Sequence, residues 1–173
     1  MASKKNITPP EKLQPQHNFK TFNSGKLVLD EWLHKRALQN EETGASRTYV
    51  ICIKNQVIGF YALAVGSIEA KNVSGKVRRN MPDPIPVMIM GRLAVDQKHQ
   101  KVGMGRGLLK DAVARIVQAS KIAGIRAILV HALDDDAKIF YQRCGFQVSP
   151  LDPMTLMITV TDAIRAFSEG TLD

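Results

Sequence analysis

Apolar and polar residues are spaced along the chain in blocks that predict strands and helices. Arg47–Ile53 alternates as a strand does, Lys54–Gln56 is a short polar turn, and Val57–Ile68 returns as a longer strand. Val87–Val95 is apolar and branched enough for an inner strand. These runs predict a β-sheet whose first two strands are antiparallel and joined by a hairpin turn.

Helical spacing appears in three segments, each followed by a glycine. The segments are Lys26–Glu42, the run from Leu108 to about Ala123, and Ala137–Arg143. Gly44 and Gly145 are expected to end two of them, and Gly124 is expected to be a left-handed stop for the third. The remaining elements are a strand at Ala127–Leu133, a strand at Met154–Val160 and a short helix at Thr161–Phe167.

This order of elements predicts one α/β (α+β) domain that spans residues 1–173. The expected sheet is mixed, mostly antiparallel and flanked by helices. Residues 1–18 are expected to be a partly extended N-terminal segment, because Pro9, Pro10 and Pro15 exclude a helix there.

Composition limits the class of protein. Of the 173 residues, 45% are hydrophobic and 23% are charged, which is usual for a globular domain. No apolar run approaches the ~18 residues of a membrane span. The basic N-terminus is not followed by the apolar core of a secretory signal. We therefore expect a cytoplasmic protein without a membrane segment.

Charge and metal-ligand residues change this picture only in part. Lysine and arginine outnumber the acidic residues by 24 to 16, which gives a formal net charge of +8. Such an excess favours a polyanionic partner, although charge alone neither requires nor excludes a nucleic acid. Cys52 and Cys144 are isolated in the sequence, and the four histidines lack ligand-spaced neighbours, so no metal site is expected.

A glycine-rich stretch follows the strand Val87–Val95. Gly103, Gly105 and Gly107 lead directly into a helical run. A glycine loop that opens a helix after a strand directs backbone N–H groups at one point, which is typical of a phosphate site. Gly107 is followed by Leu108, so the stretch has neither the Lys-Ser/Thr of a P-loop nor the third glycine of a dinucleotide loop.

Two motifs carry a family resemblance. Gln100–Gly105 reads Q-x-x-G-x-G, and Ala137–Phe146 reads A-x-x-F-Y-x-x-x-G-F. In this order they resemble the motifs of GNAT-superfamily N-acetyltransferases, and the resemblance covers nearly the whole chain. It implies a sheet with two splayed strands that hold acetyl-CoA as cosubstrate. It also implies that Tyr141 is the general acid that protonates the departing thiolate.

The same resemblance implies which residues contact the coenzyme. Backbone groups of the strand end would pair with the pantetheine arm, and the glycine loop would hold the diphosphate. The residues are Leu93, Ala94, Val95, Gln100, Lys101, Val102, Gly103, Met104, Gly105 and Arg106. Lys101 departs from the family pattern, because glycine is common there. We interpret it as an added charge near the phosphates.

Further segments resemble the toxin branch of the superfamily. They are Phe22–Gly25, Leu29–Leu33, Arg36–Asn40, Gly44–Tyr49 and Gly91–Asp96. Toxins of this branch acetylate the amino group of aminoacyl-tRNA, block translation and are held in check by a ribbon-helix-helix antitoxin. The resemblance therefore implies aminoacyl-tRNA and such an antitoxin as partners, and it leaves a homodimer open.

Residues 70–86 form a basic segment that contains prolines. The segment has four positive charges and no acidic residue before Asp83. It could be a solvated connection, but we interpret it as an arm that contacts phosphates. Arg78 and Arg79 in this arm, together with Arg92, are expected to bind the tRNA.

The acceptor amine can also be considered from the sequence. No carboxylate lies within Val87–Val95, the strand where many relatives place a base. An α-amino group ionises near pH 8 and a lysine near 10.4, so the missing carboxylate fits an aminoacyl ester better than a protein lysine. Glu69 or Asp96 could still act as a base through water. The alternatives are a GNAT enzyme for a small-molecule amine or a protein amine, and a non-enzymatic nucleic-acid-binding module.

Overall fold

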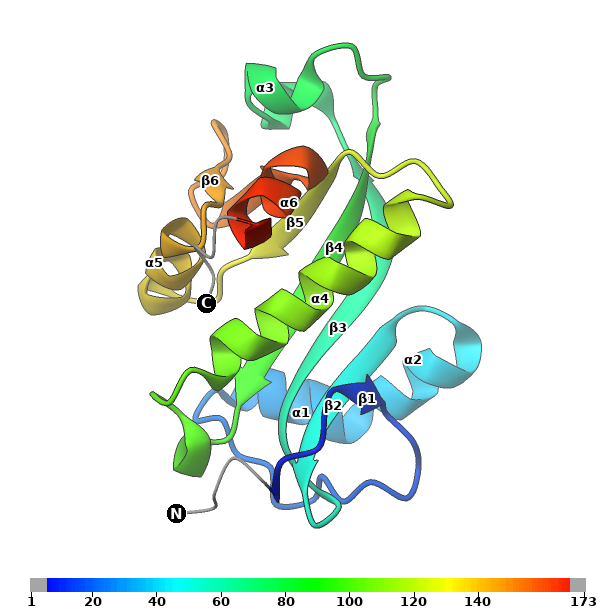
Figure 1. Cartoon of the computed structure of the whole chain (residues 1–173), viewed down its shortest axis with the longest axis vertical. Helices are drawn as coiled ribbons and strands as arrows, with labels where there is room; N and C mark the ends of the chain where they lie inside the picture. The colour runs from blue at the N-terminus through cyan, green and yellow to red at the C-terminus, as the bar shows by residue number, and fades with distance from the viewer. Residues whose placement is uncertain (1–5, 169–173) are drawn as a thin grey trace. The chain divides into compact units, whose positions relative to one another are not determined.

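The structure is a computed structural model that describes residues 6–168 (Figure 1). The strands are β1 (Glu11–Lys12), β2 (Arg47–Ile53), β3 (Gln56–Ile68), β4 (Ile85–Val95), β5 (Ala127–His131), β6 (Gln147–Val148) and β7 (Thr155–Thr159). The α-helices are α1 (Leu27–Lys35), α2 (Ala37–Thr43), α3 (Gly75–Arg78), α4 (Met104–Ser120), α5 (Asp135–Arg143) and α6 (Val160–Ser168). Two short 3-10 helices, η2 (Ala70–Asn72) and η3 (Gln97–His99), lie between them.

The strands form one mixed sheet in the order β1-β2-β3-β4-β5-β7-β6. β4 and β5 pair in parallel, whereas β1 with β2, β2 with β3, β5 with β7 and β6 with β7 pair antiparallel. The α/β fold with a mixed, mostly antiparallel sheet is therefore confirmed. The chain divides into two compact units, one with the residues up to Ala64 and Arg92–Asp111, the other with Val65–Gly91 and the residues from Ala112 on. β3, β4 and α4 each run through both units.

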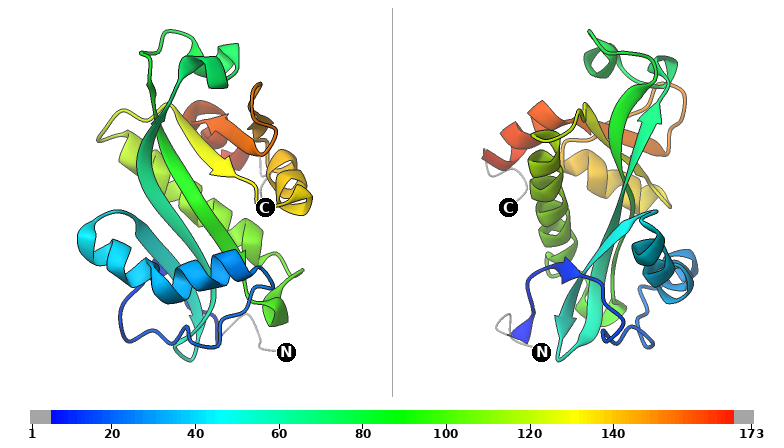
Figure 2. Two further views of the ribbon diagram at one scale, coloured as in Figure 1. Left: turned by 180° about the vertical axis from the view of Figure 1, so that it is seen from behind. Right: turned by 90° about the vertical axis from the view of Figure 1, so that its right-hand side faces the viewer.

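In the first unit, helices cover both faces of β2 and β3. α1 and α2 lie on one face and the first turns of α4 on the other (Figure 2). The α1–α2 side contains a buried cluster that includes Phe22, Leu33, Ala37, Val50 and Phe60. On the α4 side, a Cβ added to Gly59 would lie 3.0 Å from Leu108 Cδ1, so the strand and helix approach closely there.

The second unit has its own core, on β4, β5 and β7. Its buried residues are Val73, Val77, Ile85, Val87, Ala127, Leu129 and Met157. The connection between β3 and β4, which includes α3, lies at the top of Figure 1. The Arg126 side chain donates to the carbonyl oxygens of Lys76 and Val77 and so ties α3 to the start of β5.

Two helix predictions were wrong at their boundaries. The expected helix Lys26–Glu42 is two helices, α1 and α2, that meet at Arg36, where φ is −122°. No glycine or proline marks this break, so periodicity could not reveal it. The stop at Gly124 was also wrong, because α4 ends at Ser120. The Ser120 hydroxyl donates to the Val117 carbonyl, and tight turns follow.

The expected loop at residues 70–86 is more ordered than predicted. It contains η2 and α3, and Val73 and Val77 bury one face of this segment in the core of the second unit. The i, i+4 spacing of these two valines was the signal that the charges obscured. The short strand β6 was missed as well, since two residues carry no periodicity. In residues 6–168 no helix has the length and apolarity to cross a membrane.

Candidate active site

β4 continues beyond its pairing with β5. Val87–Met90 pairs in parallel register with Ala127–Val130, and β4 then runs on for five more residues, from Gly91 to Val95. Within the described residues, Gly91–Val95 is not paired with β5. The backbone of Leu93, Ala94 and Val95 lies in this continuation, as a pairing with the pantetheine arm would require.

The glycine loop after β4 has the backbone geometry of an anion site. Gly103 has φ of +89°, and a Cβ placed on it would meet nothing within 4 Å. α4 begins at Met104, and the Gly107 N–H donates to the Gly103 carbonyl in its first turn. The N–H groups of the residues before Gly107 have no carbonyl behind them in the helix. An open left-handed glycine and a helix N-terminus together fit the diphosphate of acetyl-CoA.

Gln100 fixes the loop to the strand end. Its side-chain amide donates to the carbonyls of Val95 and Ser24, each at 2.8 Å. Asp96 acts similarly, because its carboxylate accepts from the backbone N–H groups of Asn23 and Lys98. Both side chains therefore fix the backbone around the loop. The glutamine of the Q-x-x-G-x-G motif thus has a structural role, whether or not it also contacts the ligand.

Lys101 adopts a left-handed backbone conformation, with φ of 65°. A side chain costs about 1 kcal/mol in this region and glycine does not, which accounts for glycine being common at this point of the family pattern. Lys101 therefore places a positive charge beside the loop at the cost of a strained backbone.

Lys101→Gly should therefore change the stability of the protein and its affinity for acetyl-CoA in opposite directions. We expect the free energy of unfolding to rise by about 1 kcal/mol and the affinity for acetyl-CoA to fall about two- to five-fold through the removal of the charge. Denaturant unfolding and calorimetric titration measure the two effects, with Lys98→Ala as a control for charge on the neighbouring 3-10 helix. Unchanged affinity would exclude a contact between Lys101 and the phosphates.

Tyr141 lies on α5, which begins with a capping aspartate. The Asp134 carboxylate accepts from the Ala137 N–H at 2.9 Å. The Tyr141 ring is buried between Phe140 and Phe146, with ring centroids 5.2 and 5.5 Å away. Burial, and secondarily the neighbouring Cys144 thiol, raise the pKa of Tyr141 well above its usual value near 10. The phenol is protonated at neutral pH, as any tyrosine is, so it has a proton to donate.

A polar chain at the end of β5 was not visible in the sequence. The Thr155 hydroxyl donates to the Asp152 carboxylate at 2.6 Å, and His131 Nδ1 lies 3.0 Å from the same hydroxyl. Since Thr155 donates to Asp152, it accepts from His131 Nδ1, so the neutral tautomer of this exposed histidine would have Nε2 as its acceptor. The hydrogen bond from Thr155 holds the pKa of Asp152 below its usual range. His131 is thus a candidate proton acceptor in the second unit.

The basic arm is partly neutralised. Lys71 pairs with Glu69 at 3.2 Å, and Lys76 pairs with Asp162 at 2.6 Å. Arg78 is exposed but donates to the Val73 carbonyl, while Arg79 is exposed beyond the end of α3. The arm therefore presents mainly its two arginines, and Arg78 also helps to hold the segment together.

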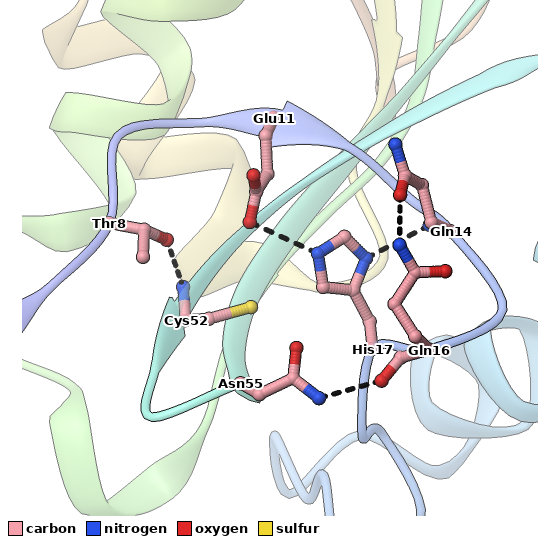
Figure 3. A network of polar contacts seen from close by, with 7 residues as sticks. All are labelled: Thr8, Glu11, Gln14, Gln16, His17, Cys52 and Asn55. Atoms are coloured by element: carbon pink, nitrogen blue, oxygen red, sulfur yellow. Dashed lines mark hydrogen bonds and ion pairs between the residues drawn. The ribbon is translucent and has the colours of Figure 1, made fainter.

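Three metal-ligand residue types meet in the first unit, although their spacing in the sequence gave no hint of it. Ligand atoms of Glu11, His17 and Cys52 lie within 4.8 Å of one another (Figure 3). The hydrogen bonds of His17 argue against metal binding, because both of its ring nitrogens already have partners. His17 Nδ1 accepts from the Gln14 N–H, so Nε2 carries the proton and donates it to Glu11. Burial and Glu11 also raise the pKa of the Cys52 thiol to about 11. We interpret the cluster as structural.

The candidate site residues are thus divided between the two units. The first contains the strand end, the glycine loop and Arg92, and the second contains Tyr141, His131 and the basic arm.

Comparison with protein families and solved structures adds to this geometry. Residues 44–148 match the model of the acetyltransferase (GNAT) domain. A tRNA-acetylating toxin of Mycobacterium tuberculosis (strain ATCC 25618 / H37Rv) is 49% identical over 154 residues, which are 89% of this chain and 93% of the toxin.

Solved toxin structures are similar as well. AtaT in complex with acetyl-methionyl-tRNAfMet superposes with a TM-score of 0.85 at 25% identity, covering 93% of this chain and 99% of AtaT. A mutant of AtaT bound to acetyl-CoA and the C-terminus of the antitoxin AtaR has a TM-score of 0.81 at 25% identity, covering 94% and 99% of the two chains.

Proposed function

Because the chain belongs to the GNAT acetyltransferase family, we propose that it acetylates the α-amino group of aminoacyl-tRNA and thereby blocks translation. The chain is an N-acetyltransferase that uses acetyl-CoA. The observation that carries the choice of acceptor is the 49% identity, over 89% of the chain, to a tRNA-acetylating toxin. The arginines of the basic arm support the same acceptor.

The strand end, the glycine loop and Tyr141 each have a role in this proposal. Acetyl-CoA, when bound, supplies an acetyl group activated as a thioester. The backbone of Leu93–Val95 would align the pantetheine arm, and the N–H groups of Val102–Arg106 would hold the diphosphate. Tyr141 would give its proton to the sulfur as the thiolate leaves. A backbone N–H of β4 would polarise the thioester carbonyl.

The acceptor amine needs little help to lose its proton. The α-amino group of an aminoacyl ester has a pKa below that of a free lysine by more than two units. A substantial fraction is therefore neutral at physiological pH, which is consistent with a strand β4 that carries no carboxylate. A protein lysine or a polyamine would require a stronger base.

The partners follow from the relatives. AtaT has been solved with the C-terminus of its antitoxin AtaR, and we propose that an antitoxin of the ribbon-helix-helix type likewise restrains this chain. A homodimer is compatible with the proposal. The reaction would take place in the cytoplasm, where charged tRNA is found.

The basic arm gives a prediction on salt dependence. Arg79→Ala combined with Arg78→Gln should flatten the fall of tRNA affinity with salt, by about 0.7–0.9 in the logarithmic slope for each phosphate that the variant no longer binds. The glutamine keeps a donor for the Val73 carbonyl. Affinity should weaken about equally for different tRNAs, since phosphate contacts do not read bases.

Binding of charged tRNA to the wild type and the double variant over a salt series measures this effect. Acetyl-CoA affinity serves as the control and should hardly change. Coinciding slopes would mean that the two arginines contact no phosphate of the tRNA, and would favour the small-molecule acceptor.

A comparison of acceptors tests the proposed function. Labelled acetyl-CoA is offered with charged tRNA, deacylated tRNA, a polyamine and a lysine peptide in parallel reactions. We expect label to be transferred to charged tRNA alone among the four. Transfer to the polyamine or the peptide, with none to charged tRNA, would replace the proposal with one of the alternative acceptors.

A further inference from the structure

Arg92 is stacked on an aromatic pair in the first unit. Its guanidinium carbon lies 4.6 Å from the centroid of the Trp32 ring. Trp32 is in turn stacked on Phe60, with centroids 6.0 Å apart and planes within 11°. Arg92 comes from β4 and Trp32 from α1, so this cation–π contact joins a strand and a helix.

One N–H of this half-buried guanidinium has no hydrogen-bond partner in the part of the chain that the structure describes. Arg92 Nε is buried and has no hydrogen-bond partner within the described residues. No acidic side chain there is paired with Arg92, and burial lowers its pKa from the usual value. A buried donor without a partner costs free energy, and an apolar residue of similar length would pack on Trp32 without that cost. A guanidinium that lies on Trp32 and has a free N–H suits an anionic ligand.

The position of Arg92 on β4 limits which anion this can be. Arg92 directly precedes Leu93–Val95, the strand end to which we assign the pantetheine arm. It is therefore next in the chain to the residues along which the acetyl group would lie. In aminoacyl-tRNA the reacting amine belongs to the amino acid, which is esterified to the ribose of the last nucleotide. The anion nearest to that amine is the phosphodiester on the 5′ side of the terminal adenosine.

We propose that Arg92 binds this terminal phosphodiester and that Trp32 is the positioning residue that orients its guanidinium. The inference rests on the proposed function and narrows it, because it gives one arginine a single phosphate at the reacting end. The planar fork of an arginine suits a phosphate, and an ammonium group would match it less well.

The probes are two acceptor analogues that differ in the presence of this phosphate and the cytidine before it. An aminoacyl group is joined through an amide to the 3′ position of adenosine in one, and of the dinucleotide CpA in the other. Trp32 is the one tryptophan of the 173 residues, so its fluorescence reports binding at the site without acetyl-CoA and without turnover. We expect the CpA analogue to bind the wild type roughly 10- to 100-fold more tightly, the range for a hydrogen bond to a charged group.

Variants assign that difference to Arg92. Arg92→Met keeps a long side chain over Trp32 and should bind both analogues equally, at the affinity of the wild type for the adenosine analogue. Arg92→Lys should recover only part of the difference. Trp32→Phe, followed by calorimetry, should lose part of it while Arg92 remains. Lys35→Ala, on an exposed residue of the same helix, is the matched control and should behave as the wild type.

The outcomes separate the inference from the proposed function. If the wild type binds both analogues equally or neither of them, or if a folded Arg92→Met still distinguishes them, the inference is overturned. Acetylation of charged tRNA by the same protein would then leave the proposed function standing. Thermal unfolding with acetyl-CoA present shows whether each variant is folded and binds the coenzyme.

Discussion

Tyr141→Phe should lower the turnover number by roughly 10²–10⁴-fold, the usual range for a positioned proton donor. Protonation of the coenzyme A sulfur as the thioester breaks assists its departure and prevents the thiolate from returning. Tyr141 is the buried phenol of the A-x-x-F-Y-x-x-x-G-F motif, and it carries its proton at neutral pH. The affinity for acetyl-CoA should stay the same, because we assign the diphosphate to the glycine loop, to which Tyr141 does not belong.

Steady-state kinetics with charged tRNA and calorimetric titration with acetyl-CoA separate these two quantities. Tyr49→Phe removes one hydroxyl from another tyrosine, on β2, and serves as the matched control. Growth of cells that express the wild type should stop, and growth with the Tyr141 variant should continue. A Tyr141→Phe protein with a near-normal rate would mean that another group protonates the sulfur.

The same variant has a consequence for stability at high pH. A phenol with a pKa raised by burial favours the folded state fully below pH ~10, its unfolded value, and loses this contribution as the pH rises further. The free energy of unfolding of the wild type should therefore fall more steeply above pH 10 than that of Tyr141→Phe. Parallel curves would show that the phenol is not shielded from water.

Gly105→Val should abolish binding of acetyl-CoA while the protein stays folded. Gly105 is the second residue of α4, where the N–H groups without helix partners gather. A β-branched side chain there would take the place that the diphosphate needs beside the backbone. Calorimetric titration should show no measurable heat of binding, and circular dichroism should match that of the wild type.

Gly107→Val is the matched control for this substitution. Gly107 lies two residues further along the same helix, and a Cβ on it would meet nothing within 4 Å. Both substitutions place a valine in the first turn of α4, so their cost in helix propensity is similar. Gly107→Val should bind acetyl-CoA close to normally. If both variants bind, the glycine loop is not the diphosphate site.

Local patterns predicted most of the fold. The strands β2 and β3 and the hairpin between them were confirmed because alternation and a polar turn specify them within a few residues. The glycines that follow α2 and α5, Gly44 and Gly145, were likewise predictable, since each acts on its own neighbours. The break at Arg36 carries no such local mark and was predicted wrongly.

The candidate site was predictable where a contiguous motif carries it. The glycine loop and Tyr141 belong to short motifs, whereas the chain from Asp152 through Thr155 to His131 is assembled only by strand pairing. The stacking of Arg92 on Trp32 joins residues far apart in the sequence. The structural role of Gln100 could not be predicted either, because its amide binds the carbonyl of Ser24, which is distant in the sequence, as well as that of Val95.

The position of the transferred acetyl group tests the central claim most directly. Charged tRNA is incubated with the protein and acetyl-CoA, digested with a nuclease, and the terminal aminoacyl-adenosine is analysed by mass spectrometry. We expect this fragment to gain the mass of one acetyl group, located on the α-amino group of the amino acid. An unmodified aminoacyl-adenosine, with the acetyl group found on a base, a polyamine or a protein, would contradict the account.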